Sequence, residues 1–544
     1  MLVGEAVGRV LVALGADTVF GVVGSGNFHA TNAMVDAGAR YVAARHEGGA
    51  VMMADGYARV SGRLGVLSVH QGPGLTNATT GITEAAKSRT PLVVLAADTG
   101  AAAVRSNFRI DQGGLATAVG AMAERVHSAG SAVADTVRAV RTAVEQRRTV
   151  VLNLPLDVQA LPVPELPALA PVVPLPAPRP AAAAVAELAA ILDRAERPVF
   201  LAGRGARHAG PAVAALAEQC GALLATSAVA KGLFAADPWS LDVSGGFASP
   251  LAAELIGAAD VVVAFGCSLS MWTTRHGKLI GPQATVVQVD LDPDAIGANR
   301  PIDLGVLGDV AATAADTTEA VKPKAGYRDG ALRDRIAREV RWRDVSYVDN
   351  GTAGATVDPR TLSIALDDLL PADRVVAVDS GNFMGYPSMY LSVPDEQGFC
   401  FTQAFQSIGL GLGTAIGAAL ARPDRLPVAA LGDGGALMGI SELETAVRLG
   451  LPLVVVVYDD LGYGAEVHHF GPDGFELGTV RFPDTDIAAI GRGFGCTGVT
   501  VRGADDLAPV VDWLAGPRDA PIVIDAKVTA DTGSWWLEEA FRGH

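Results

Sequence analysis

Short apolar runs alternate with stretches of helical spacing along most of the 544-residue chain. Apolar runs of four to six residues predict strands buried on both faces, and the segments between them predict crossover helices. Repeated strand–helix units of this kind predict an α/β fold built on doubly wound parallel sheets. In the first part of the chain, helices are predicted at 3–14, at 47–60 and from Leu75, and strands at 18–23, 40–43, 64–69, 91–96 and 150–154.

The pattern divides the chain into three α/β units. The first covers residues 1–160 and ends at a proline-rich stretch, 161–184, which predicts an extended linker because proline suits neither helix nor sheet. The second unit covers 185–325 and the third covers 355–544, with polar and charged residues between them. Strands of the second unit are predicted at 197–202, 261–266 and 285–290.

Two acidic clusters in the third unit each follow an apolar run. Gly432-Asp433-Gly434-Gly435 follows the first run, and Asp459-Asp460-Leu461-Gly462 follows the second. The right-handed crossover of a strand–helix–strand unit would bring Asp433 and Asp460 to the same sheet edge. Two carboxylates beside glycines that permit close backbone approach suit a hard divalent cation that bridges to a diphosphate. The predicted strands span 426–431 and 453–458, with a helix at 441–449 between them.

Composition narrows the class of partner. The formal charge of −17, from 42 basic and 59 acidic residues, argues against nucleic acid or an anionic membrane as the main partner. No basic leader and no long uninterrupted apolar stretch is present, so a cytoplasmic location is expected. The four scattered cysteines form no CxxC pair, which favours packing thiols over a disulfide frame or a zinc site: Cys220, Cys267, Cys400 and Cys496.

The first cluster, with a second acidic pair 27 residues beyond Asp433, resembles the motif of thiamine diphosphate (ThDP) enzymes. The resemblance implies that Asp433 and Asp460 bind Mg²⁺ through their side chains and Gly462 through its carbonyl. It also implies cofactor contacts at Gly432, Gly434, Gly435, Asn382 and Tyr463. Asp-Asn is usual in the family where this chain has Asp459-Asp460. The extra carboxylate should leave Mg²⁺ binding intact but more sensitive to pH.

Two further motifs support the resemblance. Arg45-His46-Glu47 is similar to the segment that supplies a glutamate to the aminopyrimidine ring, which implies that Glu47 activates the cofactor. Gln406-Ser407-Ile408-Gly409 is similar to the segment that holds the cofactor bent. There Ile408 would wedge between the two rings, and the Gln406 carbonyl would accept from the amino group. The likeness covers almost the whole chain and implies pyrimidine-binding, middle and diphosphate-binding domains, in that order.

Within the family, the chain is most similar to the acetolactate synthase, benzoylformate decarboxylase and pyruvate decarboxylase group. Ser25 and His70 match a serine and a histidine of benzoylformate decarboxylase, and Glu466 falls at the position of a catalytic glutamate of pyruvate decarboxylase. These three are expected to handle the substrate carboxylate and the final protonation. The middle unit, through 277–279 and 289–293, is more similar to acetolactate synthases, several of which hold FAD there.

The sequence therefore predicts ThDP- and Mg²⁺-dependent, non-oxidative decarboxylation of a 2-oxo acid, with release as an aldehyde or carboligation. The resemblance implies a homodimer as the minimum active unit, and a homotetramer is expected. One alternative is an acetolactate synthase-type carboligase with FAD, and another is a non-catalytic regulatory paralogue. Single residues also have simpler interpretations: Glu47 as a first-turn helix acid, His70 as a structural histidine and Glu466 as a solvated loop charge.

Overall fold

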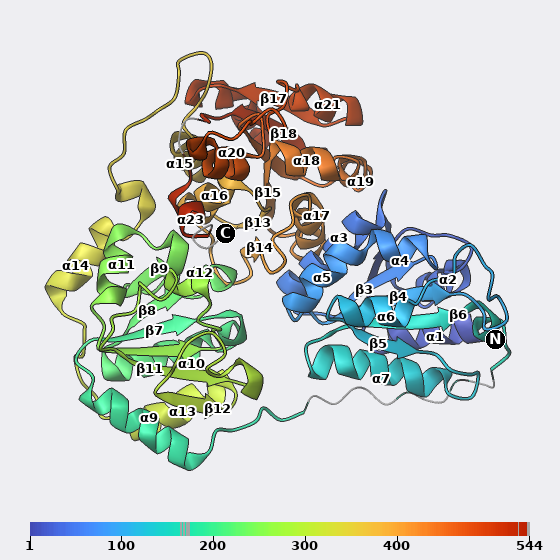
Figure 1. Cartoon of the computed structure of the whole chain (residues 1–544), viewed down its shortest axis with the longest axis horizontal. Coiled ribbons are helices and arrows are strands. Elements are labelled where there is room, and N and C mark those ends of the chain that lie inside the picture. Colours follow the sequence, from blue (N-terminus) through green and yellow to red (C-terminus); the bar gives the residue numbers. More distant parts are fainter. Residues whose placement is uncertain (164–165, 167–168, 170–174, 531–532, 541–544) are drawn as a thin grey trace.

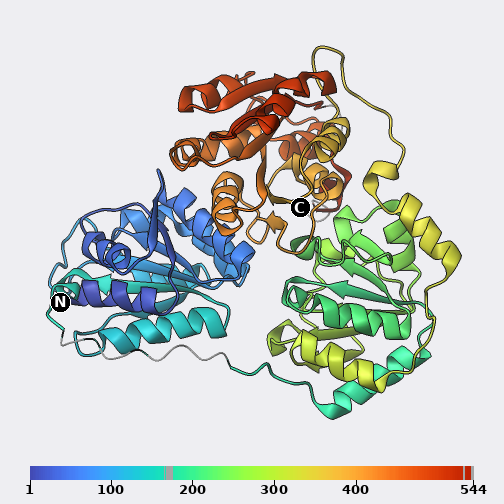
Figure 2. The same cartoon turned by 180° about the vertical axis from the view of Figure 1, so that it is seen from behind.

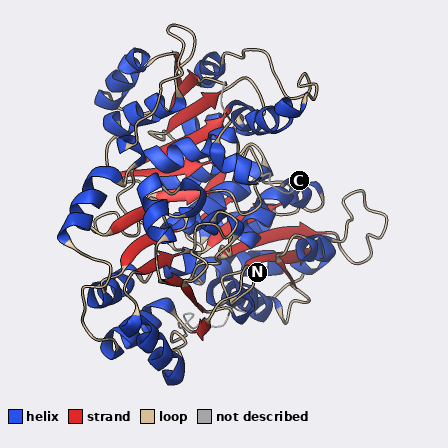
Figure 3. Cartoon of the chain, turned by 60° about the vertical axis from the view of Figure 1, so that its left-hand side comes forward, coloured by secondary structure: helices blue, strands red, loops and turns tan. Residues whose placement is uncertain are grey.

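Three six-stranded parallel sheets, each between layers of helices, form the computed structural model (Figures 1 and 3). The structure describes residues 1–163, 166, 169, 175–530 and 533–540. The predicted α/β fold with three doubly wound parallel sheets is confirmed. None of the described helices has the length and hydropathy needed to cross a membrane.

The first sheet has the strand order β2-β1-β3-β4-β6-β5. Each predicted strand of this unit is present, but β5 was missed because it lies at the sheet edge, with no fully buried side chain to form an apolar run. The strands are β1 Thr18–Gly21, β2 Arg40–Ala43, β3 Gly65–Val69, β4 Leu92–Asp98, β5 Met122–Arg125 and β6 Thr149–Pro155. The helices are α1 Val3–Ala13, α2 Phe28–Asp36, α3 Glu47–Ser61, α4 Pro73–Asn77, α5 Thr79–Lys87, α6 Gln112–Ala118, α7 Ala132–Glu145 and α8 Leu156–Gln159.

The second sheet has the order β12-β11-β10-β7-β8-β9. Residues 164–165, 167–168 and 170–174 of the predicted linker at 161–184 lie outside the described residues, and a helix already begins at Ala182. The strands are β7 Pro198–Ala202, β8 Leu223–Thr226, β9 Ser240–Val243, β10 Val261–Phe265, β11 Thr285–Asp290 and β12 Leu304–Leu307. The main helices are α9 Ala182–Arg194, α10 Gly210–Cys220, α11 Pro250–Gly257, α12 Met271–Thr274, α13 Val310–Ala320 and α14 Gly330–Glu339.

The third sheet has the order β14-β13-β15-β16-β18-β17, which repeats the pattern of the first. Its two predicted strands are β15 and β16, and the predicted helix between them is α19, although a second helix, α18, precedes it. The strands are β13 Arg374–Val378, β14 Phe399–Phe401, β15 Leu426–Gly432, β16 Val454–Asp459, β17 Thr497–Val501 and β18 Ile522–Lys527. The helices are α15 Pro359–Leu369, α16 Gly385–Tyr390, α17 Gly411–Ala421, α18 Asp433–Gly439, α19 Glu442–Arg448, α20 Gly464–Phe470, α21 Ile487–Phe494, α22 Ala508–Ala515 and α23 Trp535–Ala540.

Helix α3 connects β2 to β3 in the first domain, and α17 connects β14 to β15 in the third domain, so the two helices are topologically equivalent. They pack against each other (Figures 1 and 2). Glycines at the crossing let the two backbones touch. A Cβ on Gly56 would lie 2.4 Å from the Thr414 carbonyl oxygen, and one on Gly417 would lie 2.0 Å from the Met53 carbonyl oxygen. Since any side chain there would force the helices apart, these glycines fix how the two domains meet.

Two buried glutamates fasten the same interface from opposite sides. Glu442, on α19, accepts hydrogen bonds from the backbone amides of Arg45 at 3.1 Å and His46 at 2.9 Å. Glu84, on α5, accepts from the backbone amide of Phe405 at 2.7 Å. Each acid therefore holds the loop that precedes the other domain's helix. These are the loops that carry the predicted site residues Glu47, Gln406 and Ile408.

Candidate active site

Asp433 and Asp460 lie side by side at the carboxyl edge of the third sheet. Asp433 follows β15 and Asp460 follows β16, and these parallel strands are paired so that Gly432 lies opposite Tyr458. Burial raises the pKa of the Asp460 carboxyl to about 8, and the negative charge of Asp433 adds to this effect. Burial and the Asp459 charge together raise the pKa of Asp433 to about 7. A cation between the two carboxylates would remove the cost of ionising both.

The neighbouring acid, Asp459, has its charge balanced on the other side. Its Oδ2 accepts from the Lys527 ammonium at 2.5 Å, and its Oδ1 accepts from the Leu461 amide at 3.1 Å. Asp459 is almost fully buried. Asp459 therefore has a lysine counter-ion. Asp460 has no such ion pair among the described residues, and the charge of Asp433 acts on it.

Glycines and strained backbone shape the rest of this edge. A Cβ on Gly434 would lie 2.6 Å from the Tyr463 ring, and one on Gly435 would lie 2.5 Å from Asp379 Oδ2. Two non-glycine residues at the edge, Gln406 and Leu461, have positive φ angles of 61° and 60°. Strained backbone of this kind concentrates at functional sites, where the surrounding structure holds it in place.

Asp379 at the end of β13 is a site residue that the sequence did not reveal. Its Oδ2 accepts from the Gly409 amide at 2.8 Å, and its Oδ1 accepts from the Leu410 amide at 3.2 Å. Burial raises the pKa of this carboxyl to about 6. Asp379 thereby ties the loop that carries Ile408 to the end of β13, the strand that pairs with β15.

A cavity of about 280 Å³ opens beside Asp433. Gly434, Met438 and Tyr463 line it, and Phe482 closes it with its ring 5.0 Å from that of Tyr463. The covering segment is held by backbone hydrogen bonds of 2.9 Å from Tyr463 to Val480 and from Phe482 to Leu461. Gly434 and Gly435 let the Tyr463 ring and Asp379 pack against the start of α18, and the two carboxylates beside the cavity suit a cation that also binds phosphate oxygens.

The donor set fits a hard divalent cation only together with other oxygens. Among the described residues no group of three His, Cys, Asp or Glu side chains is arranged to hold a metal. Mg²⁺ is commonly held by one or two carboxylates together with phosphate oxygens and water. Asp433 and Asp460 supply the two carboxylates. Asn382, whose side chain donates to Asp460, keeps that carboxylate in position.

Ser25, His70 and Glu47 meet at the carboxyl edge of the first sheet. Ser25 Oγ lies 3.4 Å from His70 Nε2, and His70 Nδ1 lies 2.9 Å from the Gln71 carbonyl oxygen. A Cβ on Gly74 would lie 3.3 Å from the His70 Cβ and 3.5 Å from Glu47 Oε1. Because the carbonyl of Gln71 requires a proton on Nδ1, Nε2 is left as an acceptor toward Ser25.

The first residue of α3, Glu47, has one partner that sequence reasoning did not assign. The Asn77 side-chain amide, at the end of α4, donates to Glu47 Oε2 at 3.0 Å. The other carboxylate oxygen is not used by this hydrogen bond. Asn77 lies in the segment 72–77, which is similar to the corresponding segment of the family. A single asparagine gives no pattern in the sequence from which its hydrogen bond to Glu47 could be predicted.

Within one chain the predicted site residues form two groups. Ser25, His70 and Glu47 lie on the first sheet, and Glu47 is not among the residues around the 280 Å³ cavity. Glu466 lies on α20, which begins against Asp460, because a Cβ on Gly464 would lie 2.1 Å from Asp460 Oδ2. The structure therefore places Glu466 with the diphosphate edge and separates it from His70.

The middle sheet gives no support to a bound FAD. Its strand order reverses between β7 and β10, and nucleotides in such sheets bind in the crevice at that point. At this point the backbone that follows β7 is hydrogen-bonded to the backbone that follows β10. The Gly203 amide donates to Phe265 at 2.8 Å, and the Gly205 amide donates to Gly266 at 3.0 Å. A Cβ on Gly203 would lie 2.3 Å from the Gly266 carbonyl oxygen.

Comparison with known proteins gives the same three-part division along the chain. Three family models match, described as thiamine pyrophosphate enzyme, N-terminal TPP binding domain at residues 1–124, central domain at 185–317 and C-terminal TPP binding domain at 379–526. The chain is 30% identical to a sulfoacetaldehyde acetyltransferase of Rhodobacter capsulatus, over 98% of this chain and 96% of that protein.

Two further relatives are named for other activities. A probable 2-ketoarginine decarboxylase of Pseudomonas aeruginosa is 31% identical, over 93% of this chain and 89% of that protein. An acetolactate synthase large subunit of Parasynechococcus marenigrum is 28% identical, over 94% of this chain and 85% of that protein. The chain belongs to the thiamine pyrophosphate-dependent enzymes, in the group that contains acetolactate synthases and 2-oxo acid decarboxylases.

Proposed function

We propose that this enzyme uses ThDP and Mg²⁺ to decarboxylate a 2-oxo acid without oxidation, and that the product leaves as an aldehyde or is joined to a second carbonyl compound. The observation that carries the proposal is the pair of buried carboxylates, Asp433 and Asp460, at the sheet edge where a cavity opens beside Asp433 and Gly434. When bound, ThDP supplies the electron sink that accepts the electron pair left by CO₂.

The third sheet would hold the cofactor. Asp433 and Asp460 would bind Mg²⁺ through their carboxylates and Gly462 through its carbonyl, while Gly434 and Gly435 would lie against the diphosphate. The Gln406 carbonyl and the Ile408 side chain would contact the rings. The anchoring of that loop by Asp379 supports this arrangement, because it fixes the loop to the end of β13, beside the strand that leads to Asp433.

The first sheet would supply the proton chemistry. Glu47 would exchange a proton with the pyrimidine ring through the oxygen that Asn77 does not bind. His70 Nε2, an acceptor on the Ser25 side, can take up a proton and return it when the product forms. Ser25 would orient the substrate carboxylate, and Glu466 would approach from the third sheet.

A complete site would need two copies of the chain, since Glu47 and the diphosphate edge belong to separate groups in one copy. Both edges expose large apolar side chains, which favours their burial against another subunit. At the first sheet these are Val23, Phe28, Val104 and Phe108, and at the third sheet Leu437, Met438, Phe475 and Phe482. A homodimer is therefore the proposed minimum unit, while a homotetramer and a cytoplasmic location stay predictions.

A second candidate is an acetyl transfer that involves sulfoacetaldehyde. Several relatives are named sulfoacetaldehyde acetyltransferase, which favours this candidate. A third is a carboligase of the acetolactate synthase type. The described residues give no observation in favour of the FAD that this alternative includes. A purified protein that shows flavin absorbance would restore it.

The test is to incubate the protein with ThDP, Mg²⁺ and a panel of compounds, and to identify the products by mass. The panel contains aliphatic, aromatic and guanidino 2-oxo acids, each alone and with an aldehyde acceptor, together with sulfoacetaldehyde. We expect loss of CO₂ from at least one 2-oxo acid, dependent on both cofactors. Turnover of sulfoacetaldehyde but of no 2-oxo acid, with a nucleophile added to accept the acetyl group, would favour the second candidate, and no turnover of any compound would contradict the proposal.

A further inference from the structure

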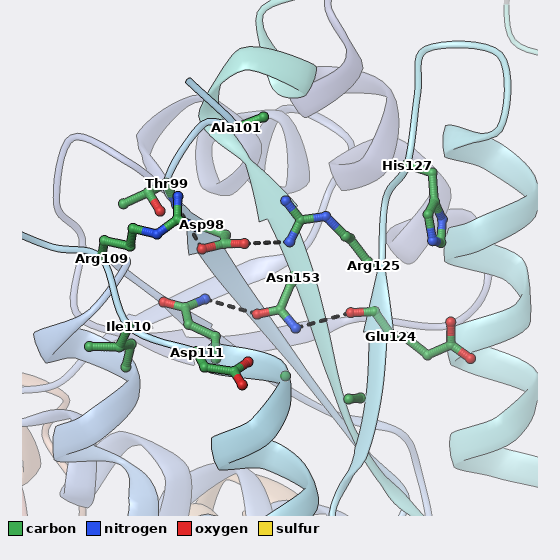
Figure 4. A pocket seen from close by; sticks show the side chains of 13 residues that line it. Asp98, Thr99, Ala101, Arg109, Ile110, Asp111, Glu124, Arg125, His127 and Asn153 are labelled. Carbon is green, nitrogen blue, oxygen red and sulfur yellow. Dashed lines mark hydrogen bonds and ion pairs between the residues drawn. The ribbon is translucent and has the colours of Figure 1, made fainter. Parts of the chain in front are cut away.

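A second cavity, of about 780 Å³, lies in the N-terminal domain apart from the residues assigned above. It opens where β4 and β6 end and α6 begins, with β5 along one side (Figure 4). None of its lining residues belongs to the predicted catalytic or cofactor-binding set. Its volume is large enough for a small organic molecule.

Buried amides build the wall of this cavity. The Gln112 side chain donates to Asn153 Oδ1 at 2.8 Å and to the Ala97 carbonyl at 2.9 Å. Asn153 in turn donates to the Glu124 carbonyl at 3.1 Å. Both side chains are almost fully buried. The wall is therefore fixed in place by its own hydrogen bonds, and no rearrangement is needed to receive a ligand.

The acidic side chains around the cavity already have partners. Asp98 pairs with Arg125 at 2.5 Å, Glu124 pairs with Arg138 at 2.7 Å, and Asp111 Oδ1 accepts from the Gly114 amide at 2.8 Å. These contacts leave little uncompensated negative charge to repel an anion from the cavity.

Arg109 differs from the other charged groups of the cavity. Its guanidinium makes no hydrogen bond or ion pair with any residue that the structure describes, and Figure 4 shows it reaching across the cavity toward Asp98 and Thr99. A guanidinium presents several donors in one plane, which match the two oxygens of a carboxylate or phosphate. The cavity thus combines a polar wall held by hydrogen bonds with the Arg109 guanidinium, which has no ion-pair partner among the described residues.

We propose that this cavity is a binding site for a small oxyanion, which pairs with the Arg109 guanidinium. The anion is either a short organic carboxylate or inorganic phosphate, since both present the same oxygens to a guanidinium. Ile110 and Ala123 also line the cavity and leave room for a short apolar part of an organic anion.

The position of Arg109 connects this site to His70. Phe108, the preceding residue, places its ring edge-on 5.0 Å from the His70 ring. The cavity residue Gln112 also accepts from the Gly72 amide at 2.8 Å, two residues after His70. An anion held on Arg109 therefore fixes the segment that forms the wall beside His70. This last consequence rests on the proposed function, whereas the binding itself does not.

The test is calorimetric titration of the full-length protein with inorganic phosphate and, separately, with succinate. ThDP and Mg²⁺ are kept saturating so that the diphosphate edge is filled, and ionic strength is held constant. We expect one saturable site per chain for at least one probe. Arg109→Gln should weaken binding at least tenfold, about 1.4 kcal/mol. Arg105→Gln, an exposed arginine of the same segment that does not line the cavity, should change binding less than twofold.

A second variant keeps the test decisive if Arg109→Gln is poorly folded. Ala123→Glu adds a carboxylate to the cavity lining, which repels an oxyanion and leaves Arg109 in place, and it should also abolish binding. Glu47→Gln is expected to stop turnover while ThDP still fills the diphosphate edge, and it should leave oxyanion binding unchanged, which separates this site from the proposed function. No saturable binding, equal losses in the Arg105 and Arg109 variants, or full binding by either cavity variant would overturn the proposal.

Discussion

The Asn77 side-chain amide donates a hydrogen bond of 3.0 Å to the Glu47 carboxylate. This contact orients Glu47 at the start of α3 and occupies one of its two oxygens. Hydrogen bonds to charged groups contribute about 1.5–3 kcal/mol, which corresponds to roughly tenfold or more in rate. Asn77 is therefore expected to act through Glu47 as a positioning residue.

Replacement of Asn77 tests this contact. Asn77→Ala should lower kcat by about tenfold with a smaller change in KM, because Glu47 loses its orientation. Asn77→Asp should shift the acid limb of the pH–rate profile upward, since a second carboxylate disfavours ionisation of Glu47. Thr76→Ala, on the same short helix, is the matched control and should leave both parameters unchanged. A uniform loss in all three variants would indicate a purely structural helix.

Replacement of Glu47 itself tests the proton step. Glu47→Gln keeps the shape of the side chain and can still accept from Asn77, but it cannot carry a proton. We expect turnover to fall by about 10²-fold to 10⁴-fold or more, while ThDP binding, measured by calorimetry, changes little. Turnover equal to that of the unaltered enzyme would remove Glu47 from the mechanism.

The branch between aldehyde release and carboligation tests His70. His70→Ala removes the Nε2 acceptor that faces Ser25 and should slow aldehyde release more than C–C bond formation, because only release needs a proton delivered to carbon. The two products are measured in one incubation with a 2-oxo acid and an acceptor aldehyde. If both products fall by the same factor, His70 acts before the branch or supports the loop only.

The pKa values at the third sheet predict how Mg²⁺ binding depends on pH. Both folded-state pKa values, about 7 for Asp433 and about 8 for Asp460, lie above the usual value for aspartate of about 3.9. In the metal-free protein the folded state therefore binds protons at these two aspartates more tightly than the unfolded state does. The stability that these groups contribute is fully present below about pH 4 and is lost as pH rises through 7 and 8. Mg²⁺ requires the ionised carboxylates, so the stabilisation that it gives should increase from pH 6 to pH 8.

Thermal unfolding at pH 6, 7 and 8, with and without Mg²⁺ and ThDP, measures this effect. Asp460→Asn restores the residue that is usual in the family and should flatten the pH dependence, since it removes one acid and its repulsion of Asp433. Asp473→Asn, an exposed acid in the same part of the chain, serves as the control and should behave like the unaltered protein. A Mg²⁺ effect that does not vary with pH would contradict the assignment of these carboxylates.

The sequence indicated those parts of the molecule that leave a local pattern. The run from Val454 to Val457 can hardly be other than a buried strand, and the spacing from Asp433 to Asp460 placed both acids on one sheet edge. Edge strands such as Met122–Arg125 lack that signal, because one or both faces are exposed. Their existence depends on pairing with a neighbouring strand, which local sequence does not encode.

Contacts between distant residues account for what sequence analysis missed at the site. Asp379 binds a loop 30 residues away, and Glu442 binds the backbone of Arg45, 397 residues away. A lone acid in a helix or after a strand is ordinarily a cap or a solvated charge. Only the three-dimensional structure shows that these acids hold the loops on which Glu47 and Ile408 lie.

The two glutamates at the domain interface therefore control the position of the site. Glu442→Ala leaves the amides of Arg45 and His46 without this acceptor in a partly buried position, which costs about 1 kcal/mol or more. We expect faster hydrogen exchange at these two amides and weaker ThDP binding, because Glu47 follows them directly. Glu442→Gln keeps one acceptor oxygen and should lose less. Glu444→Ala, which removes surface ion pairs with Arg45 and Arg448, should change exchange little. If the Glu442 and Glu444 variants exchange at the same rate, the buried acid does not hold this loop.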